Sequence, residues 1–201
     1  MKIFGDKNNF AIEYSFLSNS NDSTYGYISL WINDNNICIY NQNYQYEGDL
    51  YIIVEWFCEK LEFILGYDMF PLPVKGCTAL ELVNNANQYD SENMLEFDLW
   101  HTAKNRWILN HCWFIARGGS VLPCVYFQRI EEGIEISWDN SFWKKDDIVF
   151  ESLNGVQTVR FETFSGILSE FLFSAISDFG KIVNNKEEID SLKRKINLLE
   201  I

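Results

Sequence analysis

The sequence has few of the residues on which many catalytic and metal sites depend. It has two histidines, and its five cysteines include no Cys-x-x-Cys pair, which excludes a zinc ribbon or a thioredoxin-like motif. Nucleophile elbows, phosphate-binding loops, dinucleotide fingerprints and His-Glu-x-x-His motifs are absent as well. No apolar run reaches roughly 20 residues, the length of a membrane helix. No apolar leader follows Met1, so we expect a cytoplasmic protein.

Basic residues are also scarce. The chain has 16 basic and 29 acidic residues, a net charge of −13. A nucleic-acid binder or a protein of anionic membrane surfaces needs the opposite sign, so we expect neither role. Residues 1–100 hold 4 basic and 15 acidic residues, a net charge of −11. A basic protein partner would be steered toward this half, although acidic charge also serves solubility alone.

What the chain does have is apolar and aromatic bulk. Apolar residues make up 47% of the sequence, and Phe, Tyr and Trp alone make up 16%. This composition is typical of a soluble globular domain. With no internal repeat and no long linker, we expect a single domain over residues 1–201, with a possible subdivision near 90–120.

The first half begins with an alternating pattern. Residues 10–17 and 25–32 alternate between two faces and predict strands. Residues 33–36, Asn-Asp-Asn-Asn, predict a turn, and 37–40 the returning strand. A helix is predicted from Asp49 to Leu65, ended by Gly66, with Glu55, Glu59 and Glu62 on its polar side.

Helices and strands alternate in blocks after that. A capping box at Thr78 predicts a short helix to about Tyr89, and a stripe including Trp100, Trp107 and Phe114 predicts a helix over 95–115. Residues 125–130 and 134–138 form the clearest hairpin, and 156–161 another strand. Ser165 and Gly180 would bound a further helix. The order favours an α+β fold, with antiparallel sheets from the N-terminal meander and the central hairpin packed against amphipathic helices.

The last predicted helix begins at Lys186. It is apolar on one face, with Ile189, Leu192, Ile196 and Leu199 at spacings of three and four. This face packs either on its own chain, which we favour, or on a partner.

The sequence offers no set of catalytic or metal-binding residues that would be expected to meet at one site. His101 and His111 lie about 15 Å apart along a straight helix and cannot share a metal. A Cys–His dyad of Cys124 and His111 has no motif around it. The cysteines lie mostly in apolar contexts and are expected to be reduced, buried thiols. We therefore predict no catalytic residues, no metal and no cofactor.

Two stretches carry a family resemblance. Residues 5–13, Gly-Asp-Lys-Asn-Asn-Phe-Ala-Ile-Glu, followed by 26–32, Gly-Tyr-Ile-Ser-Leu-Trp-Ile, resemble the start of a family of bacterial immunity proteins. These proteins belong to polymorphic toxin and contact-dependent growth inhibition systems. Residues 122–129, Leu-Pro-Cys-Val-Tyr-Phe-Gln-Arg, with 134–140, Ile-Glu-Ile-Ser-Trp-Asp-Asn, are similar to a hairpin of uncharacterised bacterial proteins, often of immunity type. Both stretches are structural, and together they cover about a quarter of the chain.

The resemblance implies a cytoplasmic protein that binds and neutralises a cognate toxin, often a basic nuclease. An acidic inhibitor can cover an active site that normally holds phosphate. We place the candidate interface on the acidic and aromatic residues of the first half. These partner-binding candidates are Asp22, Asp34, Tyr44, Tyr46, Glu47, Asp49, Glu55, Glu59 and Glu62.

Two alternatives remain open at this point. One is a non-catalytic structural or adaptor domain of a bacterial assembly, docked through the helix from Lys186. The other is an enzyme with an unrecognised cleft, which a buried carboxylate of perturbed pKa would favour.

Overall fold

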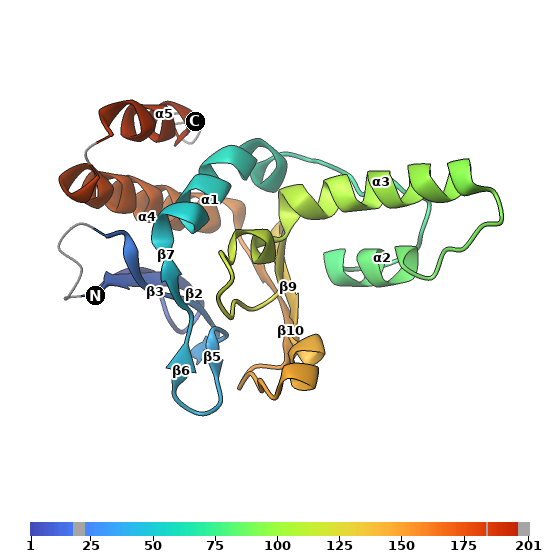
Figure 1. Cartoon of the computed structure of the whole chain (residues 1–201), viewed down its shortest axis with the longest axis horizontal. Coiled ribbons are helices and arrows are strands. Elements are labelled where there is room, and N and C mark those ends of the chain that lie inside the picture. Colours follow the sequence, from blue (N-terminus) through green and yellow to red (C-terminus); the bar gives the residue numbers. More distant parts are fainter. Residues whose placement is uncertain (18–22, 184, 197–201) are drawn as a thin grey trace.

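The computed structural model describes residues 1–17, 23–183 and 185–196, and over these ranges the fold is α+β as predicted (Figure 1). Antiparallel sheets occupy one side of the molecule and helices cover them. The strands and helices appear in the same alternating blocks that the sequence indicates. In the described ranges, no helix combines the length and apolar character needed to cross a bilayer.

The first sheet is the N-terminal meander. Its strands pair in the order β1-β2-β3-β4, and β7 also pairs with β3. Both strands predicted from the alternating pattern are confirmed, as β2 and β3. The sequence pattern did not reveal β1, which is short and largely exposed and pairs with β2 through a turn at residues 7–9. The bounds are β1 Lys2–Asp6, β2 Phe10–Phe16, β3 Tyr25–Ile32, β4 Asn35–Asn36 and β7 Glu47–Asp49.

The turn after β3 is tighter than predicted. Asn33 and Asp34 both have positive φ, 50° and 65°, as a two-residue hairpin turn requires. The return strand β4 therefore begins inside the predicted turn. The prediction of a return strand over 37–40 is wrong, because Ile37 and Cys38 turn into the core. The chain then forms a separate ribbon, β5 Ile39–Tyr40 with β6 Tyr44–Gln45.

The second sheet contains the predicted hairpin. Its order is β10-β9-β8, with β8 Val125–Ile130, β9 Gly133–Asp139 and β10 Asn154–Val159. The hairpin agrees closely with the prediction, since the structure extends the second strand by one residue at each end. The third strand begins two residues before the predicted position and ends at Val159.

The first helix has the predicted bounds. Helix α1 spans Leu50–Leu65, and the carboxylate of Asp49 caps it by accepting from the N–H of Tyr51. Helix α2, Ala79–Ala86, is capped by Thr78, whose hydroxyl accepts from the N–H of Glu81.

Four predicted helix boundaries are wrong. Helix α2 ends at Ala86, three residues before the predicted end at Tyr89. Helix α3, Met94–His111, ends before Phe114, which belongs to a 3-10 turn, η1 Trp113–Ala116. Helix α4, Phe161–Ile182, begins four residues before Ser165 and continues past Gly180. Ser165 bonds back to the Glu162 carbonyl within the helix instead of capping it. Another 3-10 turn, η2, spans Ser141–Asp146.

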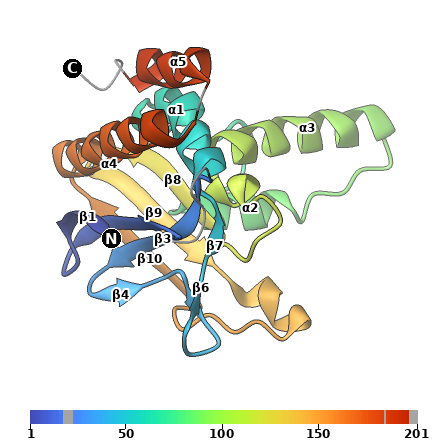
Figure 2. The same cartoon turned by 60° about the vertical axis from the view of Figure 1, so that its left-hand side comes forward.

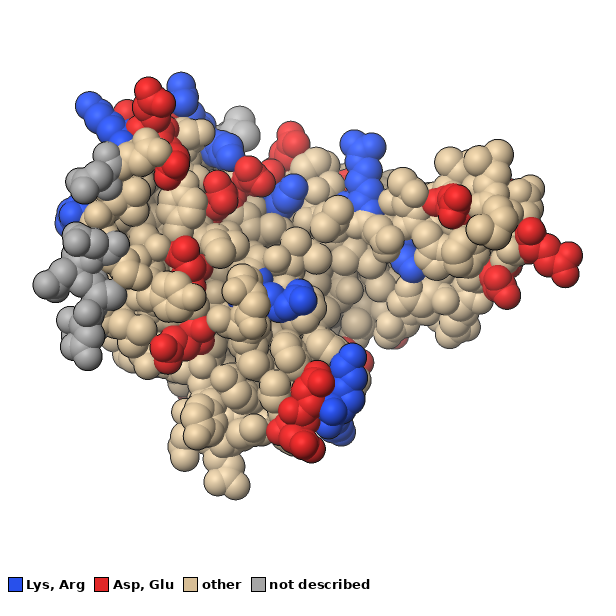
Figure 3. Space-filling model, in the orientation of Figure 1, with Lys and Arg blue, Asp and Glu red and all other residues tan. Residues whose placement is uncertain are grey.

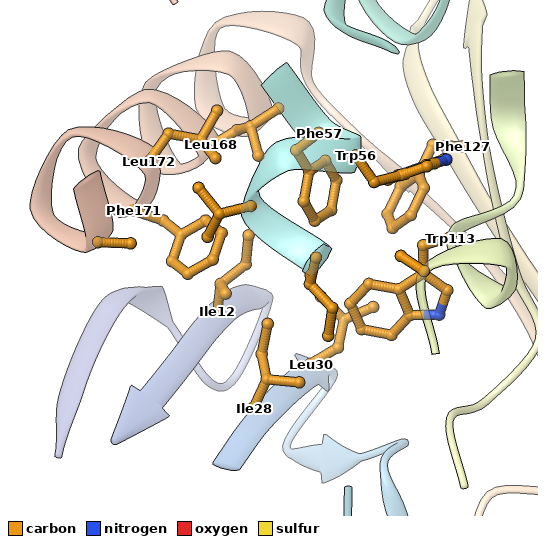
Figure 4. Packing of buried hydrophobic residues seen from close by; sticks show 14 of the residues in the cluster. Ile12, Ile28, Leu30, Trp56, Phe57, Trp113, Phe127, Leu168, Phe171 and Leu172 are labelled. Atoms are coloured by element: carbon orange, nitrogen blue, oxygen red, sulfur yellow. The ribbon is translucent and has the colours of Figure 1, made fainter. Parts of the chain in front are cut away.

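The hydrophobic core includes residues of both sheets, and α1 packs between them. Phe57 of α1 lies against Phe171 of α4 on one side and against Trp113 and Phe127 on the other (Figure 4). All four rings are buried. The same buried cluster includes Ile12, Ile28 and Leu30 of the first sheet. Edge-to-face packing of such rings adds to the burial of their area.

Helix α5, Lys186–Ile196, packs on its own chain, as we favoured from the sequence. Ile189, Leu192 and Ile196 are buried against α4 and α1 (Figure 2). The fourth residue of the predicted stripe, Leu199, lies outside the described residues.

Candidate protein-binding surface

The structure disperses the predicted interface residues. Asp34 is exposed in the turn between β3 and β4, while Glu47 is exposed in β7 at the opposite end of β3. The intervening strand separates these two sites by roughly 17 Å. Tyr44 lies at the tip of the β5–β6 ribbon and stacks on Tyr40, ring centroids 5.9 Å apart. Asp22 lies outside the described residues.

Two of the predicted residues have structural roles. Tyr46 is 0% exposed and belongs to the core, so its prediction as an aromatic anchor is wrong. Tyr46 lies between the end of β6 and the start of β7, where its ring is buried, whereas the ring of Tyr44 in β6 is exposed. Asp49 is half-buried and accepts hydrogen bonds from the Tyr51 N–H and the Thr24 hydroxyl, which fixes it as a helix cap.

The remaining three residues share one face of α1. Glu55, Glu59 and Glu62 are spaced by four and three positions, so they follow one another along the helix surface. Glu59 and Glu62 are exposed and Glu55 is half-buried. Acidic side chains, with basic ones among them, gather over α1 and α5 on the face that Figure 3 presents. We call Glu55, Glu59, Glu62 and Glu188 the α1–α5 acidic surface.

Helix α5 contributes Glu188, which is not among the residues predicted from the sequence. Burial raises the pKa of the Glu55 carboxyl, and the negative charge of Glu59 raises it further. The charge of Lys195 lowers this pKa, while Glu188 of α5 and Asp49 make smaller contributions that raise it. Burial, with Glu55 and Glu188, also raises the pKa of Tyr51 to about 12. Burial is the main cause of both shifts, and the neighbouring carboxylates add to it, so a basic side chain docked here would favour the ionised form of Glu55.

One lysine partly offsets this charge. Lys195 of α5 contacts the Glu59 carboxylate, Nζ to Oε1 3.1 Å. Both side chains are partly exposed, so the pair contributes little to stability. A basic partner could displace Lys195 at small cost. No sequence signal locates Glu188 or Lys195 here, because their place depends on how α5 docks.

The two histidines make contacts with neighbouring aromatic, backbone and lysine groups. His111 is buried, stacks on Trp107 with centroids 4.0 Å apart, and donates from Nδ1 to the Trp107 carbonyl. His101 accepts at Nδ1 from Lys104. In the part of the chain that the structure describes, no three His, Cys, Asp or Glu side chains are grouped to hold a metal ion.

The cysteines are free, and most are buried as predicted, but Cys77 is exposed. Cys124 lies beside Cys112, with the sulfurs 3.7 Å apart. Burial raises the pKa of the Glu135 carboxyl, which lies in the interior. It accepts from the Ala79 backbone N–H, a structural use that does not require a substrate.

Comparison of the chain with family models, curated proteins and solved structures gave no match. The function must therefore be inferred from the residues and geometry of this chain.

Proposed function

We propose that this chain is an immunity protein that binds a cognate bacterial toxin domain and neutralises it. The partner would be a basic domain, such as a nuclease, and the acidic protein would cover the site that normally holds phosphate. No catalysis and no cofactor are needed, because one protein–protein interface suffices.

The α1–α5 acidic surface is the observation that carries this proposal. It places four carboxylates on two packed helices, and the repulsion of Glu55 by Glu59 and Glu188 adds to burial in raising the pKa of the Glu55 carboxyl. Docking of lysine or arginine side chains would relieve that repulsion. Charges arranged in this way increase the rate of association with a basic partner and lose this effect as salt rises.

We further propose that the protein works in the cytoplasm. Support comes from its five free cysteines, two of which lie within contact distance without forming a disulfide. Such thiols fit a reducing compartment.

The adaptor alternative receives less support. Its docking element would be the apolar face of α5, and that face is buried on α1 and α4. A partner could reach it only if α5 left its own chain.

The test is to purify a complex with the protein encoded by the reading frame adjacent to this one, and to measure association by surface plasmon resonance. Glu55→Lys with Glu59→Lys should slow association about tenfold at low salt, with little change at high salt. Glu132→Lys, in the exposed turn between β8 and β9, is the matched control and should have a smaller effect. Equal effects of the variants would remove the α1–α5 acidic surface from the account.

A further inference from the structure

Helices α2 and α3 form an arm that projects from the body of the molecule (Figures 1 and 2). Contacts between the two helices hold its outer end in one shape. Tyr89 stacks on Trp100 with centroids 4.0 Å apart, and the Trp100 indole donates to the Ala86 carbonyl. Lys104 donates to the side-chain oxygen of Asn87 at 2.6 Å. The loop between the helices is thus fixed to α3.

The base of the arm is anchored in the body. Trp56 of α1 donates from its indole to the Leu109 carbonyl of α3, and Glu135 of β9 accepts from the first N–H of α2. Trp107 of α3 is buried and its indole donates to the Asp68 carbonyl. A surface presented on such a support binds with little loss of conformational entropy.

The outer end of the arm exposes large apolar side chains. Met94, Leu95 and Leu99 are 69%, 68% and 62% exposed. Leu95 and Leu99 are four residues apart and lie on the same side of α3. The buried side of this helix carries Lys104, Trp107 and His111 instead. Neighbouring exposed apolar side chains mark interaction sites, because single ones scatter but clusters are rarely left to solvent.

A rim of one charge surrounds this cluster. Residues 76–103 contain five acidic residues and no lysine or arginine. Four of the five are exposed around the outer end: Asp90, Glu92, Glu96 and Asp98. Figure 3 shows acidic side chains at the far end of the arm. Two copies of this tip would repel each other, whereas a basic partner would be attracted.

We propose that this arm tip, Met94, Leu95 and Leu99 within its acidic rim, is the anchor that inserts into a cleft of the basic toxin. The proposal rests on the proposed function. The leucines would fill an apolar part of the cleft and slow dissociation, while the rim carboxylates would meet basic residues at its edge. The α1–α5 acidic surface would then act mainly on association, and the arm tip on the lifetime of the complex.

The experiment measures dissociation of the complex with the protein encoded by the adjacent reading frame. The test variant is Leu95→Gln with Leu99→Gln, and the control is Val156→Gln, which changes an exposed apolar residue of β10. The arm variant should dissociate about 100-fold faster, since two buried leucines are lost. Its melting temperature should stay within a few degrees of wild type, because both side chains are exposed.

The outcomes separate the two proposals. If the wild-type complex is stable and the arm variant changes its dissociation rate less than twofold, the arm tip is not the anchor. The proposed function would then still stand. A wild-type chain that binds no such partner would overturn both. Sedimentation of the free protein adds a third outcome. If the free protein is a dimer that the arm variant dissociates, the arm tip binds a second copy of this chain, and its role as a toxin anchor is overturned.

Discussion

The carboxylate of Glu135 accepts a hydrogen bond from the backbone N–H of Ala79, at 3.0 Å, across 56 residues of sequence. This bond ties the first turn of α2 to the middle of β9. A negative charge at a helix N-terminus also complements the helix dipole. One buried acidic side chain therefore helps to anchor the base of the projecting arm.

Loss of this acceptor should destabilise the protein. Glu135→Ala leaves a buried N–H without its partner and should cost about 1–3 kcal/mol of unfolding free energy. Glu135→Gln keeps a carbonyl oxygen at the same place and should cost less. Urea unfolding at pH 7 measures both. Equal losses would mean that the hydrogen bond is not what Glu135 contributes.

The same residue should give stability a dependence on pH. Burial raises the pKa of the Glu135 carboxyl in the folded protein, so the folded state holds this proton more tightly than the unfolded state. Stability should fall as pH rises through the folded pKa. Glu135→Gln should remove that part of the slope in unfolding measured between pH 4 and 7. An unchanged slope would contradict a raised pKa.

Asp178 should show the opposite dependence. Burial would raise its pKa, but hydrogen bonds from Lys181, Lys2 and Tyr14 outweigh it and lower the pKa to about 2. The stability it contributes is present above the ordinary aspartate pKa and is lost as pH falls toward 2. Asp178→Asn should cost about 1 kcal/mol at pH 7, after allowance for solvent screening.

A matched control isolates that effect. Asp190→Asn changes a partly exposed aspartate whose contact to Lys193 is 3.8 Å, and it should change stability by less than about 0.5 kcal/mol. The deficit of Asp178→Asn should shrink as pH falls through 2, because the wild-type carboxyl then becomes protonated too. A deficit that persists there would point to packing instead of charge.

The aromatic centre should be the most sensitive part of the core. Phe57 is fully buried and contacts Trp113, Phe127 and Phe171. Phe57→Ala should destabilise by about 3–5 kcal/mol through lost burial and a cavity, and Phe57→Leu by less. Thermal unfolding by calorimetry checks this. A loss below 1 kcal/mol for the alanine variant would contradict a packed junction between the sheets.

Thiol labelling should separate one cysteine from the others. Cys77 is exposed, whereas Cys38 and Cys58 are buried and their pKa values are raised to about 12. Because the thiolate is the reactive form, one maleimide should couple fast to the native protein. Cys77→Ser should abolish that fast step, and denaturant should expose the remaining thiols. A fast step that survives Cys77→Ser would show that another cysteine is open.

The helices and strands were predicted correctly where their own residues form a clear apolar pattern. Helix α1 has a complete apolar stripe and a side-chain cap at Asp49, and the β8–β9 hairpin has two alternating strands around a turn. Two helix signals were misleading. Ser165 resembles a cap, yet α4 begins at Phe161 after Arg160, with no side-chain cap, and Gly180 lies inside the helix beside Ile189 of α5.

The candidate surface was only partly predictable for the same reason. The stripe of Glu55, Glu59 and Glu62 follows from helical spacing alone. Glu188 reaches it only through tertiary docking of α5, and Tyr46 does not belong to it because its ring is buried in the core between β6 and β7. The arm tip had no sequence signal, since Leu95 and Leu99 look like core residues until α3 is seen projecting from the body.

The most direct test of the central claim is co-purification. This chain, tagged and expressed from its native locus with the neighbouring reading frames, should carry a stoichiometric basic partner that kills cells when expressed alone. Recovery of the chain by itself, with no toxic neighbour, would contradict a role in immunity.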